Sequence, residues 1–163
     1  MFILALGIAA GCIRNTPEEF GAKGEYISVG AYQPQLLDKI VYNNLGQNYV
    51  ITPLQEGTII AAVKARIVNL KSTQVILIAD EDAALLTSAG GNESKPLNPG
   101  ERAVETSEQA PKDNPYRSHI WGQFQIVQNF EIAGWLFFEV PEDSEFFSFS
   151  WDNVEFLRVL YPQ

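Results

Sequence analysis

Apolar and polar residues alternate with a period of two along much of this chain. The clearest alternation lies in residues 57–72, where one set of alternate positions is Ile59, Ala61, Val63, Ala65 and Ile67. The positions on the other face include Thr58, Lys64 and Arg66. Successive side chains of a β-strand point to opposite faces, so this pattern predicts a long strand with one buried face. We expect Asn69 to end it.

Further runs rich in Val, Ile, Phe, Tyr and Trp are separated by turn-forming residues. They are residues 24–33, 36–44, 47–52, 73–80, 84–88, 121–127, 131–141, 146–151 and 154–161. No segment shows helical periodicity over more than two turns. Short strands at a spacing of about 8–12 residues, without helices between them, are typical of antiparallel sandwiches. The predicted fold is therefore all-β: an immunoglobulin-like antiparallel β-sandwich of about eight or nine short strands.

The strand predicted at residues 131–141 carries large apolar side chains on both faces. Alternation places Leu136, Phe138 and Val140 on one face and Trp135 and Phe137 on the other. One sandwich core cannot take both faces, so the outer pair needs another cover. The first candidate cover is the segment 89–118 and the second is a partner protein. Trp135 and Phe137 are accordingly candidate binding residues, and core packing is the alternative interpretation.

Residues 89–118 form a long polar insert before the aromatic-rich C-terminal third. The segment contains four prolines and three glycines. A loop of this length is unusual inside a small domain, and its composition disfavours regular strands. We expect a long, mobile loop here.

The first twelve residues, MFILALGIAAGC, are uncharged and end on the only cysteine of the chain. About eleven apolar residues are too few for a transmembrane helix, which needs about 20. Their number suits the apolar region of a secretory signal. The stretch Ala9-Ala10-Gly11-Cys12 resembles the lipobox of prokaryotic lipoproteins, in which the cysteine becomes the lipidated N-terminus. An apolar N-terminal end without a targeting role is the alternative.

This interpretation divides the chain into three parts. Residues 1–11 are a predicted signal peptide, residues 12–23 a flexible tether, and residues 24–163 the β-sandwich domain. We therefore expect an extracytoplasmic protein that is anchored to the cell membrane through lipidated Cys12. A protein partner in the cell envelope fits the same location.

Composition narrows the classes of partner. At 163 residues and 46% apolar content, the chain suffices for one domain with a sizeable core. The net charge is −9, and the basic residues are scattered singly. Nucleic acid is excluded as a partner because phosphate binding needs clustered Lys and Arg. A single cysteine forms no internal disulfide and no Cys/His spacing suits zinc, so we expect no cofactor.

Two groups of residues raise the question of chemistry. Asp80, Glu81 and Asp82 follow a predicted buried strand, and converging carboxylates suit calcium, although an acidic turn explains them as well. His119 is the only histidine, and on an extended segment Ser118 would point to the opposite face, which excludes a nucleophile–base pair. We expect a binding or structural-association role and no enzymatic activity. The alternatives are a carboxylate-based extracytoplasmic hydrolase and an accessory factor of an envelope complex.

Four stretches resemble the domain-of-unknown-function 4352 family, whose members are telokin-like, immunoglobulin-fold domains of prokaryotic lipoproteins and secreted proteins. The stretches are ITPLQEGTIIAAVKARIVN (51–69), ILIAD (76–80), NPGE (98–101) and GWLFFEVPEDS (134–144). The resemblance runs from about Gly24 to Tyr161. The segment 89–118 is longer than the family pattern.

The resemblance has implications for single residues. It implies a turn at Thr52, Pro53 and Gly57, a strand end at Asn69, core positions at Phe138 and Val140, and a strand stop at Pro141. The activity of the family is not established, so the resemblance bears on fold and compartment only.

Overall fold

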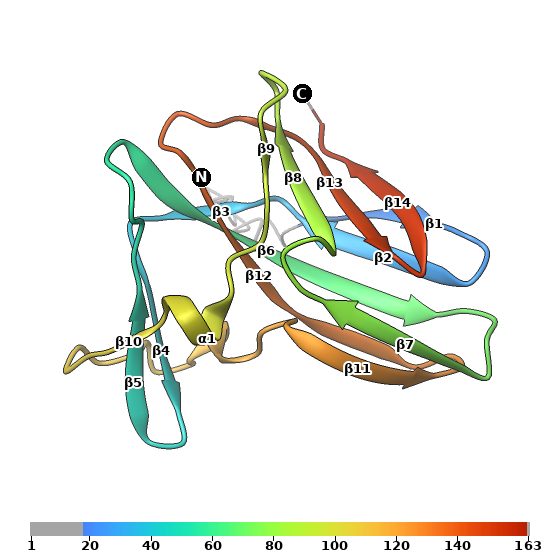
Figure 1. Cartoon of the computed structure of the whole chain (residues 1–163), viewed down its shortest axis with the longest axis horizontal. Coiled ribbons are helices and arrows are strands. Elements are labelled where there is room, and N and C mark those ends of the chain that lie inside the picture. The colour runs from blue at the N-terminus through green and yellow to red at the C-terminus, as the bar shows by residue number, and fades with distance from the viewer. Residues whose placement is uncertain (1–17, 163) are drawn as a thin grey trace, which may run out of the picture.

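The strands seen in the computed structural model, which describes residues 18–162, follow the predicted alternation closely (Figure 1). These residues form fourteen strands, one four-residue helix, α1 (Pro99–Arg102), and one 3-10 turn, η1 (Pro115–Arg117). All pairings between the strands are antiparallel. The predicted fold class, an all-β antiparallel sandwich, is confirmed. The number of strands exceeds the predicted eight or nine because the chain also forms several strands of two to five residues.

The first sheet is built around β6 (Thr58–Asn69). β2 (Ile27–Tyr32) pairs with one edge of β6, β12 (Glu131–Pro141) with the other, and β1 (Glu19–Lys23) with β2. β3 (Gln35–Leu37) continues along the β2 edge of β6 after Pro34. A proline has no N–H for a strand ladder, which accounts for the break. β6 ends at Asn69 and β12 at Pro141, as the family resemblance implies.

The second sheet has the strand order β14-β13-β8-β9. Its strands are β8 (Ala84–Ser88), β9 (Glu93–Ser94), β13 (Phe146–Asn153) and β14 (Glu155–Leu160). β14 lies beside β1 of the first sheet, and Pro96, which follows β9, forms a bridge with Phe138 of β12. A further pair, β7 (Gln74–Ala79) and β11 (Gly122–Val127), extends below the end of β6 in Figure 1. The two sheets are thus linked along both long sides.

The main core lies between these sheets. Its β6 side chains are the alternate residues Ala61, Val63, Ala65 and Ile67, and its β12 side chains are Leu136, Phe138 and Val140. The face predicted for β12 is therefore confirmed. Phe149 and Trp151 of β13 are fully buried opposite, and the rings of Phe138 and Phe149 meet edge to face at 6.4 Å. Aromatic residues of this size supply much of the burial that holds the two sheets together.

A second, smaller core lies on the outer face of the first sheet. Ile60 and Ala62 of β6 meet Trp135 and Phe137 of β12 there. They are covered by residues 40–51 and 97–117, which we call the cap. The cap contains α1, η1 and a three-stranded sheet formed by β4 (Ile40–Asn44), β5 (Gln47–Ile51) and β10 (Val104–Glu105). Figure 1 shows it on one side of the sandwich, where its strands run across the direction of β6 and β12.

The segment 89–118 is not the long, structureless loop that its composition predicts. It contains β9, α1, β10 and η1, and its apolar residues Leu97, Ala103 and Tyr116 pack on the smaller core. The side chain of Asn98 caps α1 by accepting the N–H of Gly100 at 3.0 Å. The prolines and glycines of this segment are compatible with structure, because they lie in turns between very short elements and at the starts of α1 and η1. The first candidate cover of the outer apolar pair is confirmed.

β1 corrects the predicted N-terminal boundary. Residues 19–23, expected in the tether, pair with β2 from Glu19↔Tyr32 to Lys23↔Ser28. Phe20 and Ala22 point inward, and the Phe20 ring meets Tyr161 edge to face at 5.9 Å. Burial of these two side chains explains why so polar a segment is ordered. The sandwich therefore includes residues 19–23.

Candidate functional site

The aromatic pair Trp135 and Phe137 is not an exposed platform. Trp135 is 8% exposed and Phe137 is fully buried beneath the cap. The Tyr116 ring of η1 contacts both, at centroid distances of 4.9 Å and 6.3 Å. Of the two interpretations of these residues, core packing accounts for their burial, because the chain supplies their cover itself.

The acidic residues Asp80, Glu81 and Asp82 form a turn between β7 and β8. The Asp80 carboxylate accepts the N–H of Asp82 at 3.0 Å, which is the local hydrogen bond that favours aspartate in turns. Lys95 pairs with Asp82 at 2.6 Å. Among residues 18–162, no three His, Cys, Asp or Glu side chains lie together as a metal site. The acidic-turn interpretation accounts for these residues, and the calcium candidate is corrected.

His119 lies at the border between the cap and the sandwich. Its ring meets Tyr42 of β4 at 4.8 Å and Phe137 of β12 at 5.2 Å, edge to face in both cases. Burial lowers the pKa of His119, and a hydrogen bond with the backbone of Tyr116 offsets part of this effect. The neighbouring Ser118 uses its backbone carbonyl to accept the N–H of Trp135 at 2.8 Å. The ring is thus a packing element held among aromatic side chains.

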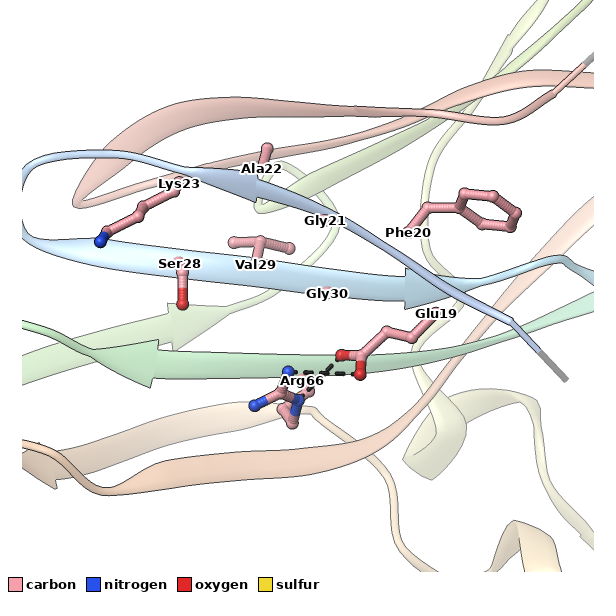
Figure 2. Close-up of a pocket in the computed structure, with 9 residues that line it drawn as sticks. All are labelled: Glu19, Phe20, Gly21, Ala22, Lys23, Ser28, Val29, Gly30 and Arg66. Atoms are coloured by element: carbon pink, nitrogen blue, oxygen red, sulfur yellow. Dashed lines mark hydrogen bonds and ion pairs between the residues drawn. The ribbon is translucent and has the colours of Figure 1, made fainter. Parts of the chain in front are cut away.

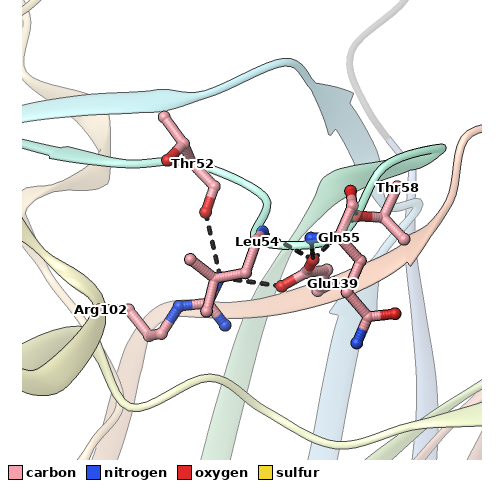
Figure 3. A network of polar contacts seen from close by, with 6 residues as sticks. All are labelled: Thr52, Leu54, Gln55, Thr58, Arg102 and Glu139. Carbon is pink, nitrogen blue, oxygen red and sulfur yellow. Dashed lines mark hydrogen bonds and ion pairs between the residues drawn. The ribbon is translucent and has the colours of Figure 1, made fainter.

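Glu139 is the centre of a polar network that the sequence did not indicate (Figure 3). Its carboxylate accepts the backbone N–H groups of Leu54 and Gln55 and the hydroxyl of Thr58, each at 2.8 Å. Its other oxygen accepts a guanidinium N–H of Arg102 at 2.8 Å. Arg102 also donates to the carbonyl of Thr52 at 3.0 Å. The network joins the strand β12, the turn between β5 and β6, and the helix α1 of the cap.

The Glu139 network stabilises the ionised carboxylate. Burial alone would raise the pKa of Glu139, but the hydrogen bonds from Arg102, Gln55, Thr58 and Leu54 outweigh it and lower the pKa to about 2. The side chains of Arg102 and Glu139 are 17% and 11% exposed. A carboxylate with a pKa of about 2 takes up no proton near neutral pH, so this cluster fixes the cap and is a poor general base.

An open groove of about 260 Å³ runs over the outer surface of β1 and β2 (Figure 2). Glu19 reaches across β2 and pairs with Arg66 of β6 at 2.8 Å and 3.2 Å. Arg66 also pairs with Glu131 of β12 at 3.1 Å. Gly21 and Gly30, which are register partners, form the floor of the groove.

The positive charge of Arg66 in this groove is paired with two carboxylates. The hydrogen bonds that Arg66 donates to Glu19 and Glu131 raise the pKa of Arg66, so the guanidinium is firmly held between two carboxylates. Figure 2 shows Lys23 and Ser28 at the end away from the Glu19–Arg66 pair. The groove therefore has a glycine floor with one amine, that of Lys23, and one hydroxyl, that of Ser28.

A third carboxylate clasps the first and last strands. Glu155, at the start of β14, accepts the backbone N–H groups of Glu25, Tyr26 and Ile27 at 2.8–2.9 Å. Burial raises the pKa of Glu155, but the three hydrogen bonds together outweigh it, so the net shift is downward. The bonds satisfy donors in the turn between β1 and β2 that have no strand partner.

The lipid-attachment candidate Cys12 lies outside the described residues. The sequence did not single out Glu19, Glu139 or Glu155, since their partners lie 37 to 130 positions away along the chain. The one local signal is the pair of glycines, Gly21 of β1 and Gly30 of β2, that leaves room beside Glu19. Such a signal is recognisable only when the strand register is known.

Comparisons with known proteins add little to this picture. No family model matches the chain, so the resemblance to the domain-of-unknown-function 4352 family stays a prediction. No curated protein matches it either. Among solved structures, MPT63, a secreted protein from Mycobacterium tuberculosis, matches over 89% of this chain and 92% of that chain, with a TM-score of 0.47 and 15% identity. A likeness this distant carries no argument about function or location.

Proposed function

We propose that this chain is an extracytoplasmic lipoprotein whose β-sandwich binds or structurally supports another component of the cell envelope. Cys12 carries the lipid anchor and the sandwich acts without catalysis. The polar clusters support the non-enzymatic part, because the carboxylates of Glu19, Glu139 and Glu155 are each bound by several donors within the chain. Among residues 18–162, no helix is long and apolar enough to span a bilayer.

The position of β1 limits how far the sandwich can lie from a lipid anchor at Cys12. Only six residues separate Cys12 from the first strand residue, Glu19. A fully extended chain spans about 3.3–3.6 Å per residue, so seven steps reach about 25 Å at most. An anchored sandwich would thus stay close to the lipid surface. Two or more acyl chains are needed for a stable anchor of this kind.

Anchoring is tested by expressing the full-length gene in its host. Wild type is expected in the detergent phase on phase partitioning, and Cys12→Ser in the aqueous phase. Mass spectrometry should find an acylated residue 12 at the mature N-terminus. Equal partitioning of both proteins, or a mature protein that retains Met1, would contradict the proposal.

The outward face of β7 and β11 supports the association role. Its side chains are Gln74, Ile76, Ile78, Gln123, Gln125 and Val127, none of them charged. Ile76 and Ile78 are about half exposed, and in the described part of the chain β7 pairs with β11 alone. At its other edge, the N–H of Ile78 donates to the Asn153 side chain at 3.0 Å. An apolar face on an edge strand is a common contact surface for other proteins.

The association surface is tested by cross-linking in the native membrane. If β7 contacts a partner protein, Ile78→Lys should remove a cross-linked adduct that wild type forms. The matched control is Leu54→Lys, which also places a charge on an exposed apolar residue but lies in the turn before β6. An adduct that survives Ile78→Lys, or that disappears equally in both variants, would argue against this face.

A further inference from the structure

The imidazole of His119 occupies the joint between the cap and the sandwich. From the cap side it meets the ring of Tyr42 and the backbone of Tyr116. From the sandwich side it meets the ring of Phe137, and its backbone forms a bridge with Trp135. Any separation of the cap from β12 must therefore change the surroundings of this ring.

One nitrogen of the ring is left without a partner. Nε2 of His119 is buried, and no hydrogen-bond partner for it exists among residues 18–162. A neutral imidazole tolerates this, because the unpaired atom is then an acceptor without charge. Protonation puts an N–H on Nε2 and a positive charge on the ring, with no acceptor in reach. An unsatisfied charged donor is far more costly to bury than a neutral acceptor.

We propose that His119 is an acid-sensitive latch: when its imidazole takes up a proton from solvent, the cap (residues 40–51 and 97–117) loosens from Trp135 and Phe137. Opening lets water reach Nε2 and exposes the aromatic cluster beneath. This device is independent of how the protein is anchored or what it binds.

Two tyrosines of the cap lie at the ring, Tyr42 and Tyr116, and neither ionises between pH 7.5 and 5.0. Burial raises the pKa of both Tyr42 and Tyr116 further above the ordinary tyrosine value, so their hydroxyls remain neutral. Tyr49 stacks on Tyr42, and Asp113 adds to the upward shift of Tyr116. At the other end of the cap, Glu139 has a pKa of about 2 and stays ionised and paired with Arg102. His119 is the only histidine of the chain. An opening of the cap between pH 7.5 and 5.0 is therefore attributed to protonation of His119.

The size of the effect is bounded by linkage. An exposed histidine has a pKa of about 6.5. If the closed cap excludes the proton and the open cap accepts it, the population of the open form rises up to about 30-fold between pH 7.5 and pH 5.0.

The test is amide hydrogen exchange of the full chain at the two pH values, reported as protection factors so that the intrinsic pH dependence cancels. Two amides at the joint between the cap and β12 serve as reporters: Leu97, which donates to the carbonyl of Phe137 at 2.7 Å, and Trp135, which donates to the carbonyl of Ser118 at 2.8 Å. In wild type their protection should fall up to about 30-fold at pH 5.0, while amides of β6 and β13 keep theirs. His119→Phe, which cannot titrate, should keep cap protection at both values.

Two outcomes would overturn the latch. One is wild-type cap protection that is the same at pH 7.5 and 5.0. The other is an equal acid-induced loss in His119→Phe. His119→Met serves as a second non-titrating variant, so that a packing defect of the larger phenyl ring is told apart from the loss of the proton.

Discussion

The carboxylate of Glu19 lies directly over Gly30, in the space that a Cβ atom on residue 30 would occupy. Because this position has no side chain, a glutamate on the edge strand β1 reaches Arg66, two strands away, across β2 (Figure 2). Position 30 therefore needs a glycine because the Glu19 side chain crosses directly over it, and not because of the backbone angles of residue 30.

Gly30→Ala is expected to displace Glu19 and break its pair with Arg66. Arg66 is 42% exposed, so the pair contributes about 0.5–1 kcal/mol at most. The measurement is urea unfolding of four proteins: wild type, Gly30→Ala, Glu19→Ala and the double variant. In the Glu19→Ala background the alanine at position 30 should cost nothing, because its Cβ then has room. An equal cost in both backgrounds would show that the glutamate is not the reason for the glycine.

Glu139→Gln should destabilise the protein at neutral pH by about 3 kcal/mol. The amide keeps some of the hydrogen bonds but leaves the guanidinium of Arg102 without its counter-charge in a mostly buried site. The control is Glu56→Gln, which removes an exposed carboxylate from the neighbouring turn. Urea midpoints at pH 7 that are the same for both variants would contradict the role given to the network.

The same carboxylate predicts a pH dependence. Its pKa is about 2 in the folded protein against 4.5 for the unperturbed group, so the folded state favours the ionised form. This stability is fully present above pH 4.5 and is lost as the pH falls towards 2, in total about 3 kcal/mol. Wild type should therefore lose more unfolding free energy between pH 4.5 and 2.5 than Glu139→Gln does. If the unfolding free energies of wild type and Glu139→Gln fall in parallel as the pH is lowered, the Glu139 carboxylate is not the source of the pH dependence.

Phe138→Ala should cost about 3–5 kcal/mol, because it removes a fully buried ring from the main core and leaves a cavity. Phe156→Ala is the control, since this ring on β14 is 55% exposed. Thermal or urea unfolding of the two variants is the measurement. Similar stabilities would mean that the faces of β12 are assigned the wrong way round.

Limited trypsin digestion should cut within residues 89–118 at Lys112 and spare Arg102. Both follow a stretch of polar sequence, but Arg102 belongs to α1 and is tied to Glu139 and Thr52, whereas Lys112 is exposed between elements. Mass spectrometry of the first fragments decides between them. Early cleavage after Arg102 would indicate that the cap is open under the conditions used.

Alternation was sufficient to predict the long strands. β12 occupies residues 131–141 as expected, and β6 ends at Asn69. Alternation succeeded there because each strand is long and at least one of its faces is buried along its length. It also indicated that Trp135 and Phe137 needed a cover, which the cap provides.

The parts that the sequence did not indicate depend on contacts between distant segments. β1 is five residues long and buries only Phe20 and Ala22, too little for a periodic pattern. β9 and β10 are two residues each and exist because β8 and β5 lie beside them. The Glu139 network draws on three separate segments, and no local pattern marks a glutamate that will meet an arginine 37 positions earlier.

The clasp of Glu155 on residues 25–27 has a consequence for the order of folding. Its three hydrogen bonds join positions 128 to 130 apart, so they form only after nearly the whole chain has been made. Folds dominated by such distant pairings close slowly, in milliseconds to seconds. The contact between the first and last parts of the chain is thus expected to close late in folding, after β14 has been made.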